Sequence, residues 1–398
     1  MFKNIGPGIL VAAAFVGPGT LTVCTLAGVQ FGYSLLWAVL ISVLATMILQ
    51  EMASRIGVIT QNGLADVVKK ELKTPWVKGL VLIVVLSAIL VGNAAYEAGN
   101  IGGATLGLEQ LFQSTTLRPF YPAFIGIMAF LLLWFGTYKT LEKVFMALVG
   151  IMGVCFVVCA ILTKPSILEI LKGTFVPRLS SGSLLTVIAL VGTTVVPYNL
   201  FLHASLVKEK WNSASELKSA RKDTVISIGV GGLVSMAILI TAASAQIHEV
   251  SSAADMAKGL EPLFGKGATY FMAIGLLAAG VTSAITAPLA AAFVASSCFG
   301  WKGGMKDMRF KLVWALVLFF GVFFLSFNIK PIEVIQFAQV ANGILLPVIT
   351  LILLWMVNKS SVMGHFKNTN VQNILGFAIL IFTLFLGAKS IVKVIGLL

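Results

Sequence analysis

Long apolar stretches occur throughout the chain, from the first dozen residues to the last two dozen. About 20 consecutive apolar residues form a helix long enough to cross the hydrocarbon core of a bilayer. Hydrophobic residue types make up 58% of the 398 residues and charged types 11%, whereas a soluble domain carries about 25% charged residues. The sequence therefore predicts an all-α polytopic membrane protein.

Windows of about 20 apolar residues predict eleven transmembrane helices. They cover residues 6–30, 34–57, 76–106, 120–138, 144–163, 184–206, 224–245, 268–297, 312–329, 332–357 and 371–388. The loops between them are too short to build a soluble domain. The lipid bilayer is thus the expected environment of nearly the whole chain.

Basic residues predict the orientation. The formal net charge is +13, and 19 of the 28 Lys and Arg residues fall on one side of the predicted spans. Because basic loops stay in the cytoplasm, we expect a multi-pass protein of the cell membrane with a cytoplasmic N-terminus and an extracytoplasmic C-terminus. The same rule explains the positive charge without a nucleic-acid partner. The first apolar segment is too long for a signal peptide, and none is expected.

Motifs of soluble catalysis do not stand out in the sequence. We find no Gly-rich phosphate loop, zinc-type Cys/His spacing or serine-triad pattern, so neither an enzyme nor a cofactor is predicted. The four cysteines lie in or beside apolar segments and are expected to be small buried hydrophobes rather than a disulfide or a metal site: Cys24, Cys155, Cys159 and Cys298.

Two predicted spans are interrupted by proline near their centres, the first at Gly17-Pro18-Gly19-Thr20 and the sixth at Val196-Pro197-Tyr198-Asn199. Proline removes one N–H donor and frees the carbonyl four residues earlier, which belongs to Ala14 or to Thr193. In lipid such a carbonyl must face protein, water or a ligand. Two breaks in matching positions are typical of inverted-repeat transporters, whose site lies between them. A pair of ordinary proline kinks is the alternative.

Motifs along nearly the whole chain point to one family. They are Gly6-Pro7-Gly8, Gln50 to Thr60, Leu141 to Val144, Pro197 to Leu206, Gly275 to Gly280, Gln339-Val340 with Pro347, and Met363-Gly364. With them the sequence resembles the natural resistance-associated macrophage protein (NRAMP) family of proton-coupled divalent-metal transporters. The resemblance implies a leucine-transporter-type fold with helices 1 and 6 broken. Its two inverted five-helix repeats would be residues 1–163 and 164–357, and residues 358–398 would add helix 11.

Both breaks depart from the family pattern. Where the family has Asp and Asn in the first break, this chain has Gly17 and Thr20. Where the family has Met and His in the second break, it has Val196 and Tyr198. The carboxylate, amide and thioether that hold the metal in the family are therefore missing at these positions. No metal site is predicted.

These losses change the expected substrate. A divalent transition metal that sheds its water needs anionic or soft ligands, which carbonyls and hydroxyls do not replace. The N–H groups that open the second halves of the broken helices carry partial positive charge. We therefore expect a small non-metal solute, with a compact anion such as bicarbonate favoured. The predicted substrate-binding residues are Ala14, Gly17, Thr20, Thr193, Thr194, Val196, Tyr198, Asn199 and Gln339.

Proton coupling is predicted from Glu97 and His203. Of the family's two acids in the third span, Ala94 stands at the first position and Glu97 at the second. Acids inside a membrane span are usually functional, and His203 matches a family histidine on the proton route. A hydrogen-bonded structural carboxyl and a satisfied core histidine are the alternatives.

Two other functions stay open from the sequence. The first is a divalent cation transporter with altered, hard-ion selectivity. The second is a non-transporting sensor or scaffold.

Overall fold

The computed structural model describes residues 6–135, 138–180, 182–245, 249–301, 303–327 and 329–395. Within these residues the chain is helical and forms no strand. The first part comprises α1 (Gly8–Phe15), α2 (Pro18–Phe31), α3 (Leu36–Thr60), α4 (Leu64–Glu71), α5 (Pro75–Phe112), α6 (Tyr121–Phe135), α7 (Tyr138–Leu162) and α8 (Ile167–Phe175). The second comprises α9 (Leu184–Thr194), α10 (Pro197–Leu206), α11 (Leu217–Ser244), α12 (Ala253–Ala257), α13 (Glu261–Phe264), α14 (Ala268–Phe299), α15 (Met308–Leu325), α16 (Pro331–Asn358), α17 (Ser360–Met363) and α18 (Asn370–Ile395).

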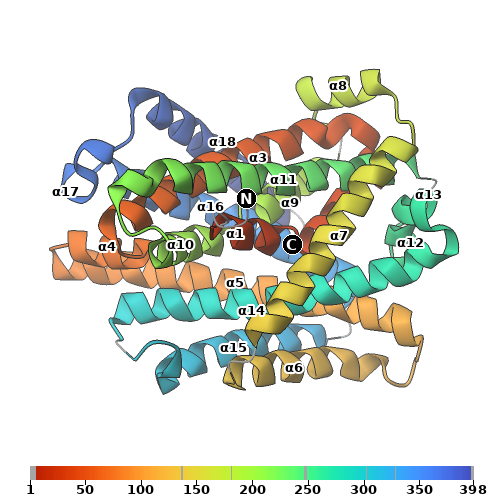
Figure 1. The fold of residues 1–398 in the computed structure, drawn as a ribbon, viewed down its shortest axis with the longest axis horizontal. Coiled ribbons are helices and arrows are strands. Elements are labelled where there is room, and N and C mark those ends of the chain that lie inside the picture. Colours follow the sequence, from red (N-terminus) through yellow and green to blue (C-terminus); the bar gives the residue numbers. More distant parts are fainter. Residues whose placement is uncertain are drawn as a thin grey trace.

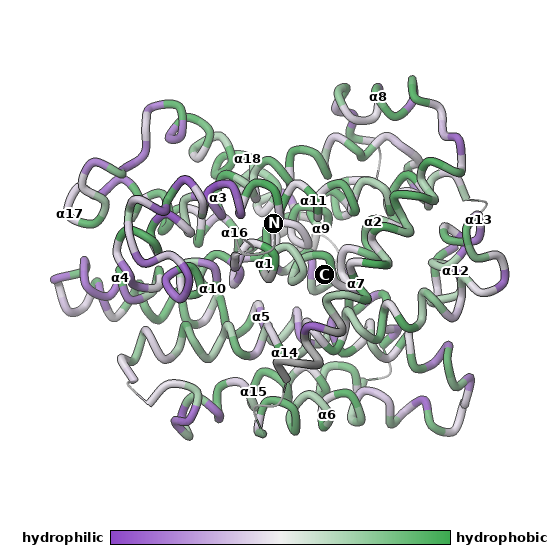
Figure 2. The backbone as a smooth tube through the Cα atoms, viewed as in Figure 1, coloured by the Kyte–Doolittle hydropathy of each residue, from purple (hydrophilic) through white to green (hydrophobic). Residues whose placement is uncertain are grey.

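The long helices cross the molecule between two polar ends (Figure 1). Hydrophilic residues gather at the ends that carry α4 and α17 on one side and α12 and α13 on the other, with a mainly hydrophobic band between them (Figure 2). This distribution is the one expected when alternate loops emerge on opposite faces of a membrane. Lys3 and Lys302, which contribute to the predicted orientation, lie outside the described residues.

The long helices provide the membrane crossings. In the part of the chain that the structure describes, nine stretches are long and apolar enough to span a membrane, and α7 with α8, bent by 120°, makes a tenth. One stretch, Pro18–Thr60, has 43 residues, which as one helix would measure about 65 Å, roughly twice the bilayer core. It holds both α2 and α3, which the prediction of eleven spans counts as separate crossings.

The ends of the helices differ from the predicted bounds by several residues. α15 begins at Met308 rather than at residue 312, because the Asp307 carboxylate accepts a hydrogen bond from the Arg309 N–H and caps the helix. α5 runs on to Phe112, beyond the predicted residue 106. These added turns contain polar residues, which a hydropathy window counts as loop.

Both proline interruptions separate two helices. Gly17, between α1 and α2, is extended with φ −110° and ψ −167°, and Pro18 is the first residue of α2. Val196, between α9 and α10, is extended with φ −81° and ψ 120°, and Pro197 opens α10. Proline is favoured at the first position of a helix because that position needs no N–H donor. The alternative of simple kinks is therefore wrong.

A buried arginine ties α3 to the C-terminal part of the chain. Arg55 donates hydrogen bonds to the Phe366 carbonyl and the Asn368 side chain, both at 2.6 Å, and to Glu51 at 3.1 Å. Glu51 also accepts from Arg221 of α11 at 2.7 Å. A buried guanidinium is costly without partners. These contacts therefore hold α3, α11 and the segment before α18 together.

Asp223 of α11 caps the first helix from a distance. Its two carboxylate oxygens accept hydrogen bonds from the backbone N–H groups of Gly6 and Gly8, each at 2.8 Å. The predicted span begins at residue 224, which puts Asp223 in the loop before it. Asp223 lies inside α11, which begins at Leu217 instead of residue 224. The carboxylate satisfies N–H groups that α1 cannot pair within itself.

We predict that Asp223→Ala destabilises the protein by about 1–2 kcal/mol, the usual effect of losing a helix N-cap. The measurement is thermal unfolding of purified protein in detergent. Lys222→Ala, at the exposed neighbouring position of α11, serves as the control and should unfold at the wild-type temperature. Equal unfolding temperatures for Asp223→Ala and wild type would contradict this role.

Candidate substrate site between the two helix breaks

The two breaks are joined to each other by a hydrogen bond. The hydroxyl oxygens of Thr20 in α2 and Thr193 in α9 are 2.9 Å apart. Thr20 donates its one hydroxyl proton to the carbonyl of Phe15, so Thr193 must be the donor between the two hydroxyls. The resulting relay, from Thr193 to Thr20 to Phe15, links residues 173 positions apart in the sequence.

The carbonyl freed by Pro18 is paired within the protein. Tyr96 of α5 donates its hydroxyl to the Ala14 carbonyl at 3.2 Å. Together with the relay, this contact occupies the carbonyls of both Ala14 and Phe15 at the end of α1. At the second break, no described residue donates a hydrogen bond to the Thr193 carbonyl. The first break therefore offers less negative character than its sequence predicts.

α10 contributes an aromatic ring and an amide. The Tyr198 ring packs edge-on against Tyr96, with ring centroids 5.4 Å apart. The buried side chain of Asn199 has no hydrogen-bond partner on either its nitrogen or its oxygen. Thr194 behaves differently from the prediction, because its hydroxyl donates to the Leu190 carbonyl of its own helix at 2.8 Å.

α16 closes the site with two more amides. The Gln339 side chain lies so close to Gly19 that a side chain on Gly19 would collide with its amide nitrogen, and Thr193 also borders this position. The Gln339 side-chain oxygen and the Asn342 side-chain nitrogen are buried without partners. Gln339 therefore lies beside both breaks, and its predicted role in substrate binding stays a prediction.

All nine predicted substrate-binding residues are buried, and Ala14 is only 4% exposed. The site is thus closed to both sides of the membrane in this conformation. Unpaired buried amides are uncommon in native proteins and call for a partner. Asn199, Gln339 and Asn342 place three such amides on α10 and α16.

Three polar residues of the neighbouring helices were not identified from the sequence: Tyr96, Asn342 and Ser283. The Ser283 hydroxyl, from α14, lies beside Gly17. A buried Asn inside an apolar span is itself a signal of function, so Asn342 could have been found. Tyr96 and Ser283 carry no such signal, because Tyr and Ser are common in structural roles within membrane helices.

Glu97 and His203 form hydrogen bonds of their own, separate from those at the breaks. Glu97 accepts a hydrogen bond from Asn100 at 3.2 Å and packs against Gly321 of α15, while its second oxygen is buried without a partner. His203 lies 2.9 Å from the Gln50 side-chain oxygen, and its other ring nitrogen has no partner. Neither residue is hydrogen-bonded to a break, so their predicted role in proton coupling stays a prediction.

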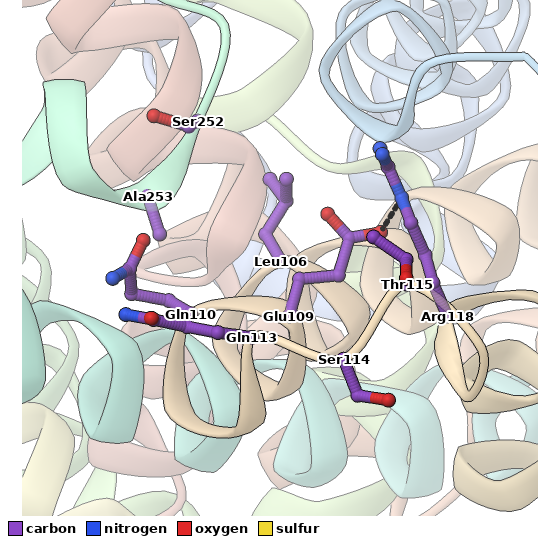
Figure 3. A pocket seen from close by; sticks show the side chains of 9 residues that line it. All are labelled: Leu106, Glu109, Gln110, Gln113, Ser114, Thr115, Arg118, Ser252 and Ala253. Carbon is purple, nitrogen blue, oxygen red and sulfur yellow. Dashed lines mark hydrogen bonds and ion pairs between the residues drawn. The ribbon is translucent and has the colours of Figure 1, made fainter.

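A polar pocket of about 230 Å³ lies at the C-terminal end of α5 (Figure 3). Glu109 and Arg118 form an ion pair at 2.8 Å across it, and the side chains around it come from the end of α5, the following loop and the start of α12. The lining residues are Leu106, Glu109, Gln110, Gln113, Ser114, Thr115, Arg118, Ser252 and Ala253. None of the predicted site residues lines this pocket.

We predict that Thr193→Val lowers stability by about 1 kcal/mol, because it removes the donor that joins the two breaks. Thr193→Ser keeps the hydroxyl and should retain most of that stability. Thermal unfolding in detergent compares the three proteins. If the Ser variant is as unstable as the Val variant, packing of the methyl group and not the hydrogen bond holds the breaks together.

Comparison with known families gives one match across the chain. The family model described as natural resistance-associated macrophage protein-like matches residues 8–393. A divalent metal cation transporter MntH from Verminephrobacter eiseniae is 29% identical over 378 residues, covering 91% of this chain and 83% of that protein. The metal transporter Nramp4 from Arabidopsis thaliana is 28% identical over 390 residues, covering 91% and 73%.

Solved structures agree on the fold. A crystal structure of a manganese transporter variant from Eremococcus coleocola superimposes with a TM-score of 0.77 at 21% identity, over 97% of this chain and 85% of that one. The structure of MhsT in complex with L-phenylalanine gives a TM-score of 0.62 at 17% identity, over 97% and 98%. The leucine-transporter-type fold of inverted repeats is thus confirmed, whereas the repeat boundaries at residues 163 and 357 stay predictions.

Proposed function

Because the chain belongs to the natural resistance-associated macrophage protein family, whose members are membrane transporters and not enzymes, we propose that it is a secondary-active transporter of a small non-metal solute. A compact anion of the bicarbonate kind is the favoured substrate. The proposed orientation has the N-terminus in the cytoplasm and the C-terminus outside the cell membrane. The observation that carries this proposal is that the residues at the two breaks present hydroxyls and unpaired amides and no charged side chain.

The first support is the chemistry of the residues at the breaks. In the described part of the chain, no group of three or more His, Cys, Asp or Glu residues could hold a metal ion. Gly17, Thr20 and Val196 supply neither charge nor sulfur at the positions where the family binds its metal. Dehydrating a divalent cation without anionic or soft ligands is unfavourable in a low dielectric.

The second support is the balance of donors and acceptors. Tyr96 and Thr20 already occupy the Ala14 and Phe15 carbonyls, which lowers the capacity of the first break to attract a cation. The first N–H groups of α2 and α10 have no carbonyl partner within their own helices and carry partial positive charge. The unpaired amide nitrogens of Asn199 and Asn342 are further donors, and the unpaired oxygens of Asn199 and Gln339 are acceptors. The proposal of an acceptor solute therefore depends on the helix N-termini and on the missing charge at position 17.

A second candidate is a divalent cation with altered, hard-ion selectivity. It is favoured by the relatives, since proteins 28–29% identical over most of the chain are named as divalent metal cation or metal transporters. It is also favoured by the Thr193 carbonyl, which has no donor among the described residues. A cation that kept part of its hydration shell could use this carbonyl and the amide oxygens.

The charge of the substrate can be tested at Thr20. Thr20→Asp and Thr20→Asn both remove the hydroxyl, and they differ in one negative charge. For an anionic substrate we predict that Thr20→Asp loses uptake while Thr20→Asn keeps more of it, because a full charge outweighs the roughly half charge of a helix end. The measurement is uptake of radiolabelled bicarbonate, formate and manganese into proteoliposomes, with manganese titration calorimetry on the same proteins.

Wild-type protein should show no tight, saturable manganese binding in that titration. Tight, saturable manganese binding by wild type would favour the cation, as would uptake of the native substrate that strengthens in Thr20→Asp relative to Thr20→Asn. Both variants should first be shown to elute as monodisperse protein.

Glu97 and His203 are the proposed proton-coupling groups. Glu97 is a buried acid with one unpaired oxygen, and the described residues offer it no ion-pair partner. A carboxyl in such surroundings can gain and release a proton during a transport cycle, whereas an amide cannot.

We predict that Glu97→Gln abolishes the part of uptake that depends on a pH gradient while the protein stays folded. Uptake is measured in proteoliposomes with and without an imposed gradient. Glu109→Gln, which alters an acid at the exposed end of the same helix, should keep the wild-type response. Unchanged pH dependence in Glu97→Gln would make Glu97 a structural residue.

A further inference from the structure

Ser283 of α14 faces the first break. A Cβ atom added to Gly17 would lie 3.0 Å from the Ser283 hydroxyl oxygen and 3.8 Å from the Ala14 carbonyl oxygen. Ser283 is buried, at 2% exposure, and the described residues provide no hydrogen-bond partner for its hydroxyl. The hydroxyl therefore points at the space that the side chain of residue 17 would otherwise fill.

The position of Ser283 is fixed by the packing of α14 on α5. One turn before it, Gly280 lies so close to Asn100 and Ala104 that no side chain fits between the helices. One turn after it, the Ala287 carbonyl accepts a hydrogen bond from Asn93 at 2.8 Å. These contacts hold the backbone of α14 on both sides of Ser283, so a larger residue at position 17 cannot push the helix away.

We propose that Ser283 contacts the substrate and that Gly17 and Ser283 form a pair that sets the selectivity of the site. The missing side chain at position 17 makes room for the Ser283 hydroxyl, which donates a neutral hydrogen bond to an oxygen atom of the solute. The inference rests on the proposed function and deepens it. It names the solute class as one that presents an acceptor oxygen toward the first break.

The first experiment measures uptake of radiolabelled bicarbonate and formate by proteoliposomes carrying wild type, Ser283→Ala or Thr282→Val. Thr282 is the matched control, because its hydroxyl is bound to the Ala278 carbonyl of its own helix at 2.8 Å. Ser283→Ala should raise KM up to about tenfold with little change in kcat, the effect of one lost hydrogen bond. Thr282→Val should leave KM unchanged. An unaltered KM in Ser283→Ala would overturn the proposal.

The second experiment needs no substrate. Gly17→Ala places a methyl group against the Ser283 hydroxyl and should lower the thermal unfolding temperature in detergent. Adding Ser283→Ala to it removes the collision and should recover part of the loss, so the two changes are not additive. Additive effects would mean that the residues do not constrain each other.

The third experiment tests selectivity with manganese alone. Gly17→Asp introduces a carboxylate that collides with Ser283, and it should bind manganese more weakly in calorimetry than the double variant Gly17→Asp with Ser283→Ala. Equal binding by the two variants would reject the pairing. If wild type instead transports a cation while Ser283→Ala still raises its KM, the substrate proposal fails and the role of Ser283 survives. If wild type takes up bicarbonate and Ser283→Ala has the same KM, the role of Ser283 is rejected while the proposed function stands.

Discussion

A helix that stops inside a membrane exposes backbone groups to a medium without water, and the protein itself must pair them. In this protein α1 and α9 end in this way, and side chains packed around the breaks pair some of the exposed groups. Tyr96 reaches from α5 to the Ala14 carbonyl, and Thr20 turns back to the Phe15 carbonyl. Thr193 extends the same relay to the other half of the chain. Each unpaired buried group would cost about 1–3 kcal/mol, so these contacts determine how the broken helices sit against α5.

The way in which the backbone is paired also decides the electrostatics of the site. The carbonyl end of α1 is covered by hydroxyl groups, whereas the first turn of α2 lies against the Gln339 amide at Gly19. With no carboxylate at position 17, helix-end charges of about half a unit are no longer overruled by a full negative charge. Glycine at position 17, where the family has a carboxylate, therefore removes a negative charge and leaves the Ser283 hydroxyl beside the break.

The sequence predicted those features that follow from local rules. Pro18 and Pro197 cannot continue a helix, so both breaks could be located, and long apolar runs located the crossings. It could not predict the roles of Tyr96 and Asp223, whose partners are backbone groups far away in the chain, or the position of Ser283 beside Gly17. Their roles arise from the packing of α5, α11 and α14 on α1, which no local spacing records. Nearness to a break in the sequence also does not fix the partner of a side chain. Thr194 lies beside the second break, and its hydroxyl donates to the Leu190 carbonyl of its own helix.

The direction of the hydroxyl relay bears on which solute can enter. Thr193 donates to Thr20, and Thr20 donates to Phe15. An acceptor solute can take over a hydroxyl proton from this relay and at the same time approach the N–H ends of α2 and α10. A cation would instead use the Thr193 carbonyl, which has no donor among the described residues, and the side-chain oxygens of Asn199 and Gln339. The Thr193 hydroxyl therefore serves the proposed acceptor solute, whereas a cation would be held by the carbonyl of the same residue.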